Sequence, residues 1–387
     1  MTLSNRGQVD PFIVMDVMRA ANQREADGHD VIHMEVGQPG TPAPKLALNA
    51  ASQALQADRL GYAEALGLPE LRARISRHYD DTYGTAVSAD QVIVTSGSSG
   101  GFQLAFLAAF DAGARIALAM PAYPAYRNII KALDLEMVPV RTGASSGYQM
   151  TAEALDEAAR RTKLDGVLIA SPANPTGAMI EPGELADIGK VAQQHGLTLI
   201  SDEIYHRLTY GTVPEATALA SNPDAIVINS FSKYYSMTGW RIGWMIAPYE
   251  MVRPIERLAQ NLFISVPTLS QIAAVEAFDA TPELESNFAV YRANRDVLMD
   301  GLPSVGFTKL APSDGAFYIY ADVSDLTRDS EALCRLILEE ANIAVTPGTD
   351  FDPEAGKTTL RFSFAGPTSH MVEAVKRLKA MKLSQVY

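Results

Sequence analysis

Five short apolar runs recur between residues 91 and 228, and segments with helical periodicity separate several of them. The runs are apolar throughout, which is typical of strands that are buried on both faces. Strands of this kind that alternate with helices form a mostly parallel sheet covered by helices on both faces. The sequence therefore predicts an α/β fold whose strands lie at 91–95, 115–119, 166–170, 197–200 and 226–228.

The two ends of the chain predict a second, smaller α/β domain. Asp10 and Pro11 are typical of the N-cap and first residue of a helix, which would end near Gly28. Residues 282–302 predict one long helix, and an amphipathic helix closes the chain, with apolar residues at helical spacing from Met371 to Met381. We expect residues 46–285 to form a large domain, and residues 1–45 to join residues 286–387 in a small one.

Composition excludes several classes of protein. The net charge of −13, with no dense run of Lys or Arg, argues against a nucleic-acid or anionic-membrane partner. A single cysteine, Cys334, excludes an internal disulfide framework and predicts a buried thiol. The six histidines lack metal-site spacing, so no metal site is predicted. No stretch approaches the roughly 20 apolar residues of a membrane span, and no secretory leader pattern opens the chain, so we expect a cytoplasmic protein.

Polar residues follow all five apolar runs. Ligands of open α/β sheets bind beyond the carboxyl ends of the strands, so parallel strands would bring these five loops to one place. Residues 97–101 are rich in glycine and serine and precede a helix expected near Phe102, whose free N–H groups suit a phosphate. Neither a P-loop nor a Rossmann fingerprint is present. The other loops supply Tyr123, Asn174, Asp202, Ser230, Lys233 and Arg241.

These residues suit one cofactor. Asp202 ends a buried strand, where an unpaired charge is costly, and it therefore needs a cationic partner. Lys233 lies in a partly desolvated place, which lowers its pKa and favours a Schiff base. Arg241 adds a bidentate charge for a phosphate, and Tyr123 adds a flat face for a ring. Together they predict pyridoxal 5'-phosphate, whose pyridinium nitrogen pairs with the carboxylate and whose ring withdraws electrons from the substrate.

The same stretches resemble the class I pyridoxal-phosphate aminotransferases, the aspartate aminotransferase family of fold type I. Residues 230–233 with 238–243 look like the lysine signature of that family. Residues 173–177 and 202–205 resemble two further signatures. Additional matches span nearly the whole chain in family order, at 61–72, 312–318, 347–351 and 360–363.

The resemblance implies a role for each candidate residue. Lys233, Asp202 and Tyr205 would be catalytic: Lys233 would hold the cofactor and move a proton, Asp202 would pair with the ring nitrogen, and Tyr205 with Asn174 would bind the ring hydroxyl. Tyr123 would stack on the ring. The phosphate would be bound by Ser98, Ser99, Ser230 and Arg241, and Gly97 and Ser232 would also belong to the cofactor-binding residues.

Substrate binding and assembly are also implied by the resemblance. Arg361 would grip the α-carboxylate of an amino acid or 2-oxo acid, with Asn174 and the backbone of Gly37 nearby. Tyr62 would reach the phosphate of a neighbouring subunit, which implies a homodimer with shared active sites. Aspartate-specific bacterial relatives often carry a lysine where this chain has Ser99. No partner for the side-chain carboxylate of aspartate or glutamate is identifiable.

Three functions fit these residues to different degrees. The first is an aminotransferase that moves an amino group between an L-amino acid and a 2-oxo acid by a ping-pong mechanism. The second is a carbon–sulfur lyase on the same scaffold, because the cofactor supplies the carbanion chemistry for both. The third is a ligand-sensing domain of a transcription regulator. This function needs an attached DNA-binding module, and we expect none because the chain is acidic and the family match begins within its first few dozen residues. The absence of an identifiable acid for a leaving group favours the aminotransferase.

Overall fold

The computed structural model describes residues 3–57 and 60–381. Its large sheet has seven strands among these residues and confirms the predicted α/β class. The five predicted strands are all present. In spatial order the sheet contains β2 (Val92–Thr95), β8 (Gly243–Ile246), β7 (Ile226–Ser230), β6 (Thr198–Asp202), β5 (Gly166–Ala170), β3 (Arg115–Met120) and β4 (Glu136–Arg141).

Strand direction brings the predicted loops together. The pairings β7–β6, β6–β5, β5–β3 and β3–β4 are parallel, whereas β8 runs antiparallel to both β7 and β2. Strand β2 therefore points the same way as β7. The carboxyl ends of all five predicted strands meet at one edge of the sheet, where ligands of such sheets bind.

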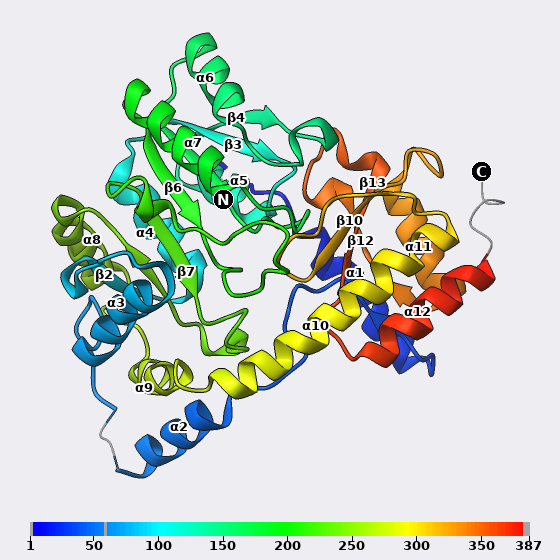
Figure 1. Cartoon of the computed structure of the whole chain (residues 1–387), viewed down its shortest axis with the longest axis horizontal. Helices are drawn as coiled ribbons and strands as arrows, with labels where there is room; N and C mark the ends of the chain where they lie inside the picture. The colour runs from blue at the N-terminus through cyan, green and yellow to red at the C-terminus, as the bar shows by residue number, and fades with distance from the viewer. Residues whose placement is uncertain (1–2, 58–59, 382–387) are drawn as a thin grey trace.

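Both faces of the large sheet are covered, which explains why its strands are apolar throughout. In β7, Ile226 and Ile228 pack with α4, α5 and α8 on one face, while Val227 belongs to the core of the other face with α6 and α7. Figure 1 shows these helices around the sheet. The helices of this part are α2 (Lys45–Ala57), α3 (Pro69–Tyr83), α4 (Gly97–Ala109), α5 (Pro124–Ala132), α6 (Ala152–Arg161), α7 (Pro182–His195), α8 (Tyr249–Leu262) and α9 (Thr268–Ala277).

A second sheet lies at the other end of the molecule, beside α10 (Thr281–Gly301), α11 (Ser330–Ala341) and α12 (Thr368–Met381) (Figure 1). Its antiparallel strands are in the order β12 (Thr346–Pro347), β13 (Thr359–Ser363), β10 (Tyr318–Asp322) and β9 (Lys309–Leu310). A separate parallel pair joins β1 (Ile32–His33) to β11 (Ile343–Ala344), so the N-terminal segment pairs with the C-terminal part. This part also contains α1 (Ile13–Ala26). The domain boundaries at 45 and 285 stay predictions.

Two helix starts differ from the sequence expectation. Helix α1 begins at Ile13 rather than after Asp10, because the carboxylate of Asp350 accepts hydrogen bonds from the backbone N–H groups of Ile13 (3.0 Å) and Val14 (3.4 Å) and so supplies the cap. Helix α4 begins at Gly97 rather than near Phe102, so the glycine- and serine-rich segment is its first turn. The long helix predicted at 282–302 and the buried thiol in α11 are confirmed.

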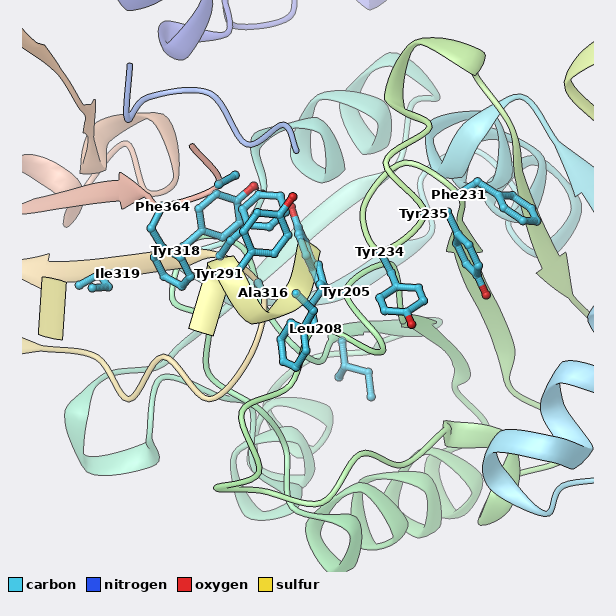
Figure 2. Close-up of a cluster of buried hydrophobic side chains, with 14 of the residues drawn as sticks. Tyr205, Leu208, Phe231, Tyr234, Tyr235, Tyr291, Ala316, Tyr318, Ile319 and Phe364 are labelled. Atoms are coloured by element: carbon cyan, nitrogen blue, oxygen red, sulfur yellow. Dashed lines mark hydrogen bonds between the residues drawn. The ribbon is translucent and has the colours of Figure 1, made fainter. Parts of the chain in front are cut away.

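Buried aromatic rings connect the two parts of the molecule (Figure 2). The ring of Tyr205, which follows β6, meets those of Phe317 and Tyr318 edge-on, with centroids 5.6 Å apart in each case. Such arrangements contribute stability beyond the burial of area. The cluster fixes β10 of the small sheet against the loop after β6. Over the described ranges, no helix has the length and apolar character needed to cross a membrane.

Candidate active site

Most of the predicted site residues line one cavity of about 220 Å³ at the carboxyl ends of the strands. The cavity lies between the large sheet, the start of α1 and the small sheet. Three predicted residues, Tyr62, Gly97 and Ser230, are outside its lining. The predicted residues that line it are Gly37, Ser98, Ser99, Tyr123, Asn174, Asp202, Tyr205, Ser232, Lys233, Arg241 and Arg361.

Lys233 lies in the turn after β7, with its amine inside the cavity. The amine donates a hydrogen bond of 2.6 Å to the carbonyl oxygen of Gly37. Burial, with a smaller contribution from the charge of Arg361, lowers the pKa of Lys233 to about 8, although the Asp202 carboxylate opposes this shift. About one tenth of the amine is therefore neutral near pH 7, far more than for an ordinary lysine, and the neutral form is the nucleophile.

Asp202 ends β6, the strand next to β7. Its carboxylate accepts hydrogen bonds from the hydroxyl of Tyr126 and from the backbone N–H of Ile204 (3.0 Å). Burial raises the pKa of Asp202 to about 6, and both hydrogen bonds oppose the rise. Both partners are neutral, so the buried carboxylate is suited to a cationic group in the cavity.

Tyr126 was missed by the sequence analysis. It lies in the first turn of α5, three residues after the N-cap residue Tyr123, and the two rings meet edge-on with centroids 5.4 Å apart. The spacing of three residues places both tyrosines on the same side of the helix. That spacing is the signal that would have identified Tyr126, since Tyr123 was already a candidate.

The predicted phosphate end of the cavity is built by α4 and the loop before β8. Gly97 has a φ of +68°, and a side chain there would collide with the guanidinium of Arg241, so only glycine fits. Ser98, Ser99 and Ser232 line the cavity beside Arg241. The hydroxyl of Ser230 instead accepts the backbone N–H of Ser232 (2.9 Å) and fixes that turn.

Arg361, in β13, enters the cavity from the small sheet. Its Nη1 donates to Oδ1 of Asn174 (2.9 Å), and its Nη2 donates to the backbone carbonyl of Glu35 and to Oγ1 of Thr346 (3.3 Å). Among the described residues, its buried Nε atom has no hydrogen-bond partner. An anchored guanidinium that lines the cavity is suited to a carboxylate ligand.

Tyr318 is a second residue that the sequence analysis left without a role. It lines the cavity from β10, and its hydroxyl lies 2.7 Å from that of Tyr205. The guanidinium carbon of Arg361 lies 4.4 Å from the centre of its ring. Tyr318 lies in the segment 312–318 that resembles the family, but that resemblance gave it no role. Only the pairing of β10 with β13 brings it close to Arg361.

The remaining wall of the cavity is apolar and was not predicted. Phe12, Val14 and Met15 from the start of α1 line it together with Val36 and Phe351. The ring of Phe12 meets Tyr123 edge-on at 5.6 Å. The N-terminal segment carries no local pattern that identifies it as part of a site, so only the fold reveals this wall.

Comparison with known proteins decides the family. Residues 29–378 match the family Aminotransferase class I and II. The chain is a class I and II aminotransferase. It is 48% identical over 383 residues to a valine–pyruvate aminotransferase of Mycobacterium tuberculosis, with 98% of each chain covered.

Solved structures of other aminotransferases share the whole fold. A crystal structure of an aminotransferase from Mycobacterium tuberculosis superposes with a TM-score of 0.97 at 47% identity, covering 100% of both chains. The aspartate aminotransferase of Thermus thermophilus with maleate superposes with a TM-score of 0.93 at 29% identity, covering 98% of this aminotransferase and 100% of that one. These names support transamination over the carbon–sulfur lyase alternative.

Proposed function

We propose that this aminotransferase binds pyridoxal 5'-phosphate in the cavity and works by a ping-pong mechanism. The observation that carries the proposal is that an amine and a buried carboxylate face one cavity from the ends of neighbouring strands, Lys233 after β7 and Asp202 in β6. The amine suits the aldehyde of the cofactor, and the carboxylate suits its ring nitrogen. The phosphate of the cofactor needs space, a hydrogen-bond donor and a positive charge. Gly97 leaves the space, Ser98 supplies a hydroxyl and Arg241 supplies the charge.

The cofactor, when bound, supplies an aldehyde for the amino group and a ring that withdraws electrons from the substrate. Lys233 would hold the cofactor through its amine, and the same amine, once free, would carry the proton to and from the substrate α-carbon. Asp202 would pair with the ring nitrogen, and Tyr205 with Asn174 would bind the ring hydroxyl. Arg361 holds the substrate carboxylate, so the α-carbon stays beside Lys233.

We further propose that the amino donor is neutral and aliphatic and that pyruvate is an acceptor. The name of the Mycobacterium tuberculosis relative supports this choice. The apolar wall formed by Phe12, Val14, Met15 and Val36 suits a hydrocarbon side chain. Of the lining residues, Lys233, Arg241 and Arg361 are the only Lys or Arg, and each already has a role. The lining also contains Asp350, which disfavours a second substrate carboxylate.

Two measurements test this function. Borohydride reduction followed by mass spectrometry should locate the cofactor on Lys233. Lys233→Ala should lose this link and all turnover, whereas Lys190→Ala, at an exposed lysine, should keep both. A reducible link that survives in Lys233→Ala would refute the proposal. In the second measurement, single amino acids are added and the cofactor absorption band is followed. Valine or alanine should convert this band at much lower concentrations than aspartate does. The reverse order would refute the neutral donor.

Tyr62 supports a homodimer with shared sites, which remains a proposal. Its side chain is 84% exposed and lies beside Thr268, at the start of α9, rather than in the cavity of its own chain. An exposed tyrosine that its own chain does not use is available to the site of a partner subunit. The cytoplasmic location stays a prediction from the sequence.

A further inference from the structure

Tyr318 stands between the three groups on which the proposed reaction depends. Its hydroxyl lies 2.7 Å from that of Tyr205, and the guanidinium carbon of Arg361 lies 4.4 Å from the centre of its ring. A side chain at Gly37 would collide with the same hydroxyl, so Tyr318 also lies against the backbone that accepts the amine of Lys233. Figure 2 shows Tyr318 and Tyr205 together in the buried cluster.

We propose that Tyr318 is a positioning residue with two separable parts: its ring orients Arg361 toward the substrate carboxylate, and its hydroxyl sets the hydrogen-bond direction of Tyr205. The proposal rests on the proposed function, because Tyr205 and Arg361 act there on the cofactor and the substrate.

The ring argument starts from the contacts of Arg361. Its two terminal nitrogens are anchored by Asn174, Glu35 and Thr346, whereas Nε is buried without a partner in the part of the chain that the structure describes. The guanidinium also faces the rings of Tyr318 and Phe351, at 4.4 and 4.7 Å from the ring centres. Cation–π contacts strengthen when the cation is removed from water, as it is here. The two rings therefore hold the plane of the guanidinium where Arg361 lines the cavity.

The hydroxyl argument starts from proton counting. Each phenol has one proton to donate, and the Tyr205–Tyr318 pair uses one of the two. If Tyr318 donates to Tyr205, then Tyr205 keeps its own proton for the ring oxygen of the cofactor. If Tyr205 donates to Tyr318, it has no proton left to donate to that oxygen and can only accept. The amine of Lys233 lies 5.6 Å from the centre of the Tyr205 ring, so the direction of this bond also affects the electrostatic surroundings of the reacting amine.

Two substitutions separate the parts. Tyr318→Phe keeps the ring and removes the hydroxyl, whereas Tyr318→Leu removes both. Tyr320→Phe is a matched control, because Tyr320 lies on the same strand, is equally buried, and bonds Oγ1 of Thr359 at 2.6 Å outside the cavity.

The first readout is the pH titration of the cofactor absorption band in the resting enzyme. We expect Tyr318→Phe to shift its midpoint by roughly one unit, the order of effect of one hydrogen bond in a buried site, while Tyr320→Phe leaves it unchanged. A midpoint in Tyr318→Phe equal to that of the native enzyme would overturn the hydroxyl part.

The second readout is the dissociation constant of isovalerate, a carboxylate without an amino group, measured by its effect on the same band. We expect Tyr318→Leu to raise this dissociation constant roughly tenfold, because the ring contact is lost. Tyr318→Phe should leave the constant close to the native value. Equal binding by native enzyme and Tyr318→Leu would overturn the ring part. A native enzyme without a borohydride-reducible band would overturn the proposed function, and this proposal with it. A native band with unchanged variants would overturn only the role of Tyr318.

Discussion

Asp202→Asn is expected to stabilise the cofactor-free protein while abolishing its turnover. Burial raises the pKa of Asp202 from its usual 3.8 to about 6. A raised pKa means that the folded state binds the proton more tightly than the unfolded state does. The stability contributed by this carboxyl is therefore full below about pH 4 and is lost as the pH rises through about 6. Near pH 7 the native fold carries a charge that the asparagine variant lacks.

The magnitude follows from the size of the shift. Two pKa units correspond to about 3 kcal/mol near pH 7, falling to about 1 kcal/mol near pH 4.5. With about 2 cal/mol/K of unfolding entropy per residue, the larger value raises the Tm of a chain of this length by roughly 4 °C. The amide of asparagine retains both contacts of the carboxylate, because its oxygen accepts from the backbone of Ile204 and its NH₂ group donates to the hydroxyl of Tyr126.

Thermal unfolding of protein stripped of cofactor, at two pH values, provides the assay. Asp111→Asn, at an exposed carboxylate, is the matched control and should not change the Tm. If the Tm of Asp202→Asn does not exceed that of the native protein near pH 7, or exceeds it equally at both pH values, burial of this charge does not destabilise the fold.

Uptake of pyridoxal 5'-phosphate by the stripped enzyme should accelerate through about pH 8, where Lys233 loses its proton. Stopped-flow absorbance gives the midpoint, and a value near that of free lysine would contradict the effect of burial. Arg361→Ala should raise KM for every amino-acid donor by roughly 10- to 100-fold, since a charged carboxylate contact is lost whatever the side chain. Steady-state kinetics with valine, alanine and phenylalanine measure this, and an effect confined to dicarboxylic donors would assign Arg361 to the side chain. Mixing Lys233→Ala with Tyr62→Phe subunits should restore activity, because each hybrid dimer has one site free of both changes; no recovery after verified subunit exchange would exclude shared sites.

Local patterns were sufficient for the framework of the cavity. Asp202 and Lys233 each follow an apolar run, and parallel strands bring such ends together whatever lies between them. Strand β8 was missed because it follows directly on the segment read as a lysine signature. Strand β4 lies at the edge of the sheet, is partly exposed and contains Pro139, so it lacks the continuous apolar character of the others.

Contacts between distant segments were beyond the reach of sequence patterns. Tyr126 bonds a carboxylate 76 residues away, and Tyr205 meets Tyr318 across 113 residues. The start of α1 depends on Asp350, 337 residues from Ile13. Only the contact of Tyr205 with Tyr318 joins the two sheets, but all three link segments that are far apart in the chain, so no local spacing reports the contact itself.

The parallel pair formed by β1 and β11 has a consequence for synthesis on the ribosome. The two strands are roughly 310 residues apart, so β1 emerges long before its partner exists. At about 5–20 residues per second, the N-terminal segment waits some 15–60 s without the strand that completes it. During that interval the large sheet can assemble, while the apolar residues at the start of α1 remain uncovered. Nascent chains stalled before residue 343 should therefore expose this segment to chaperones and proteases, and release of β11 should protect it.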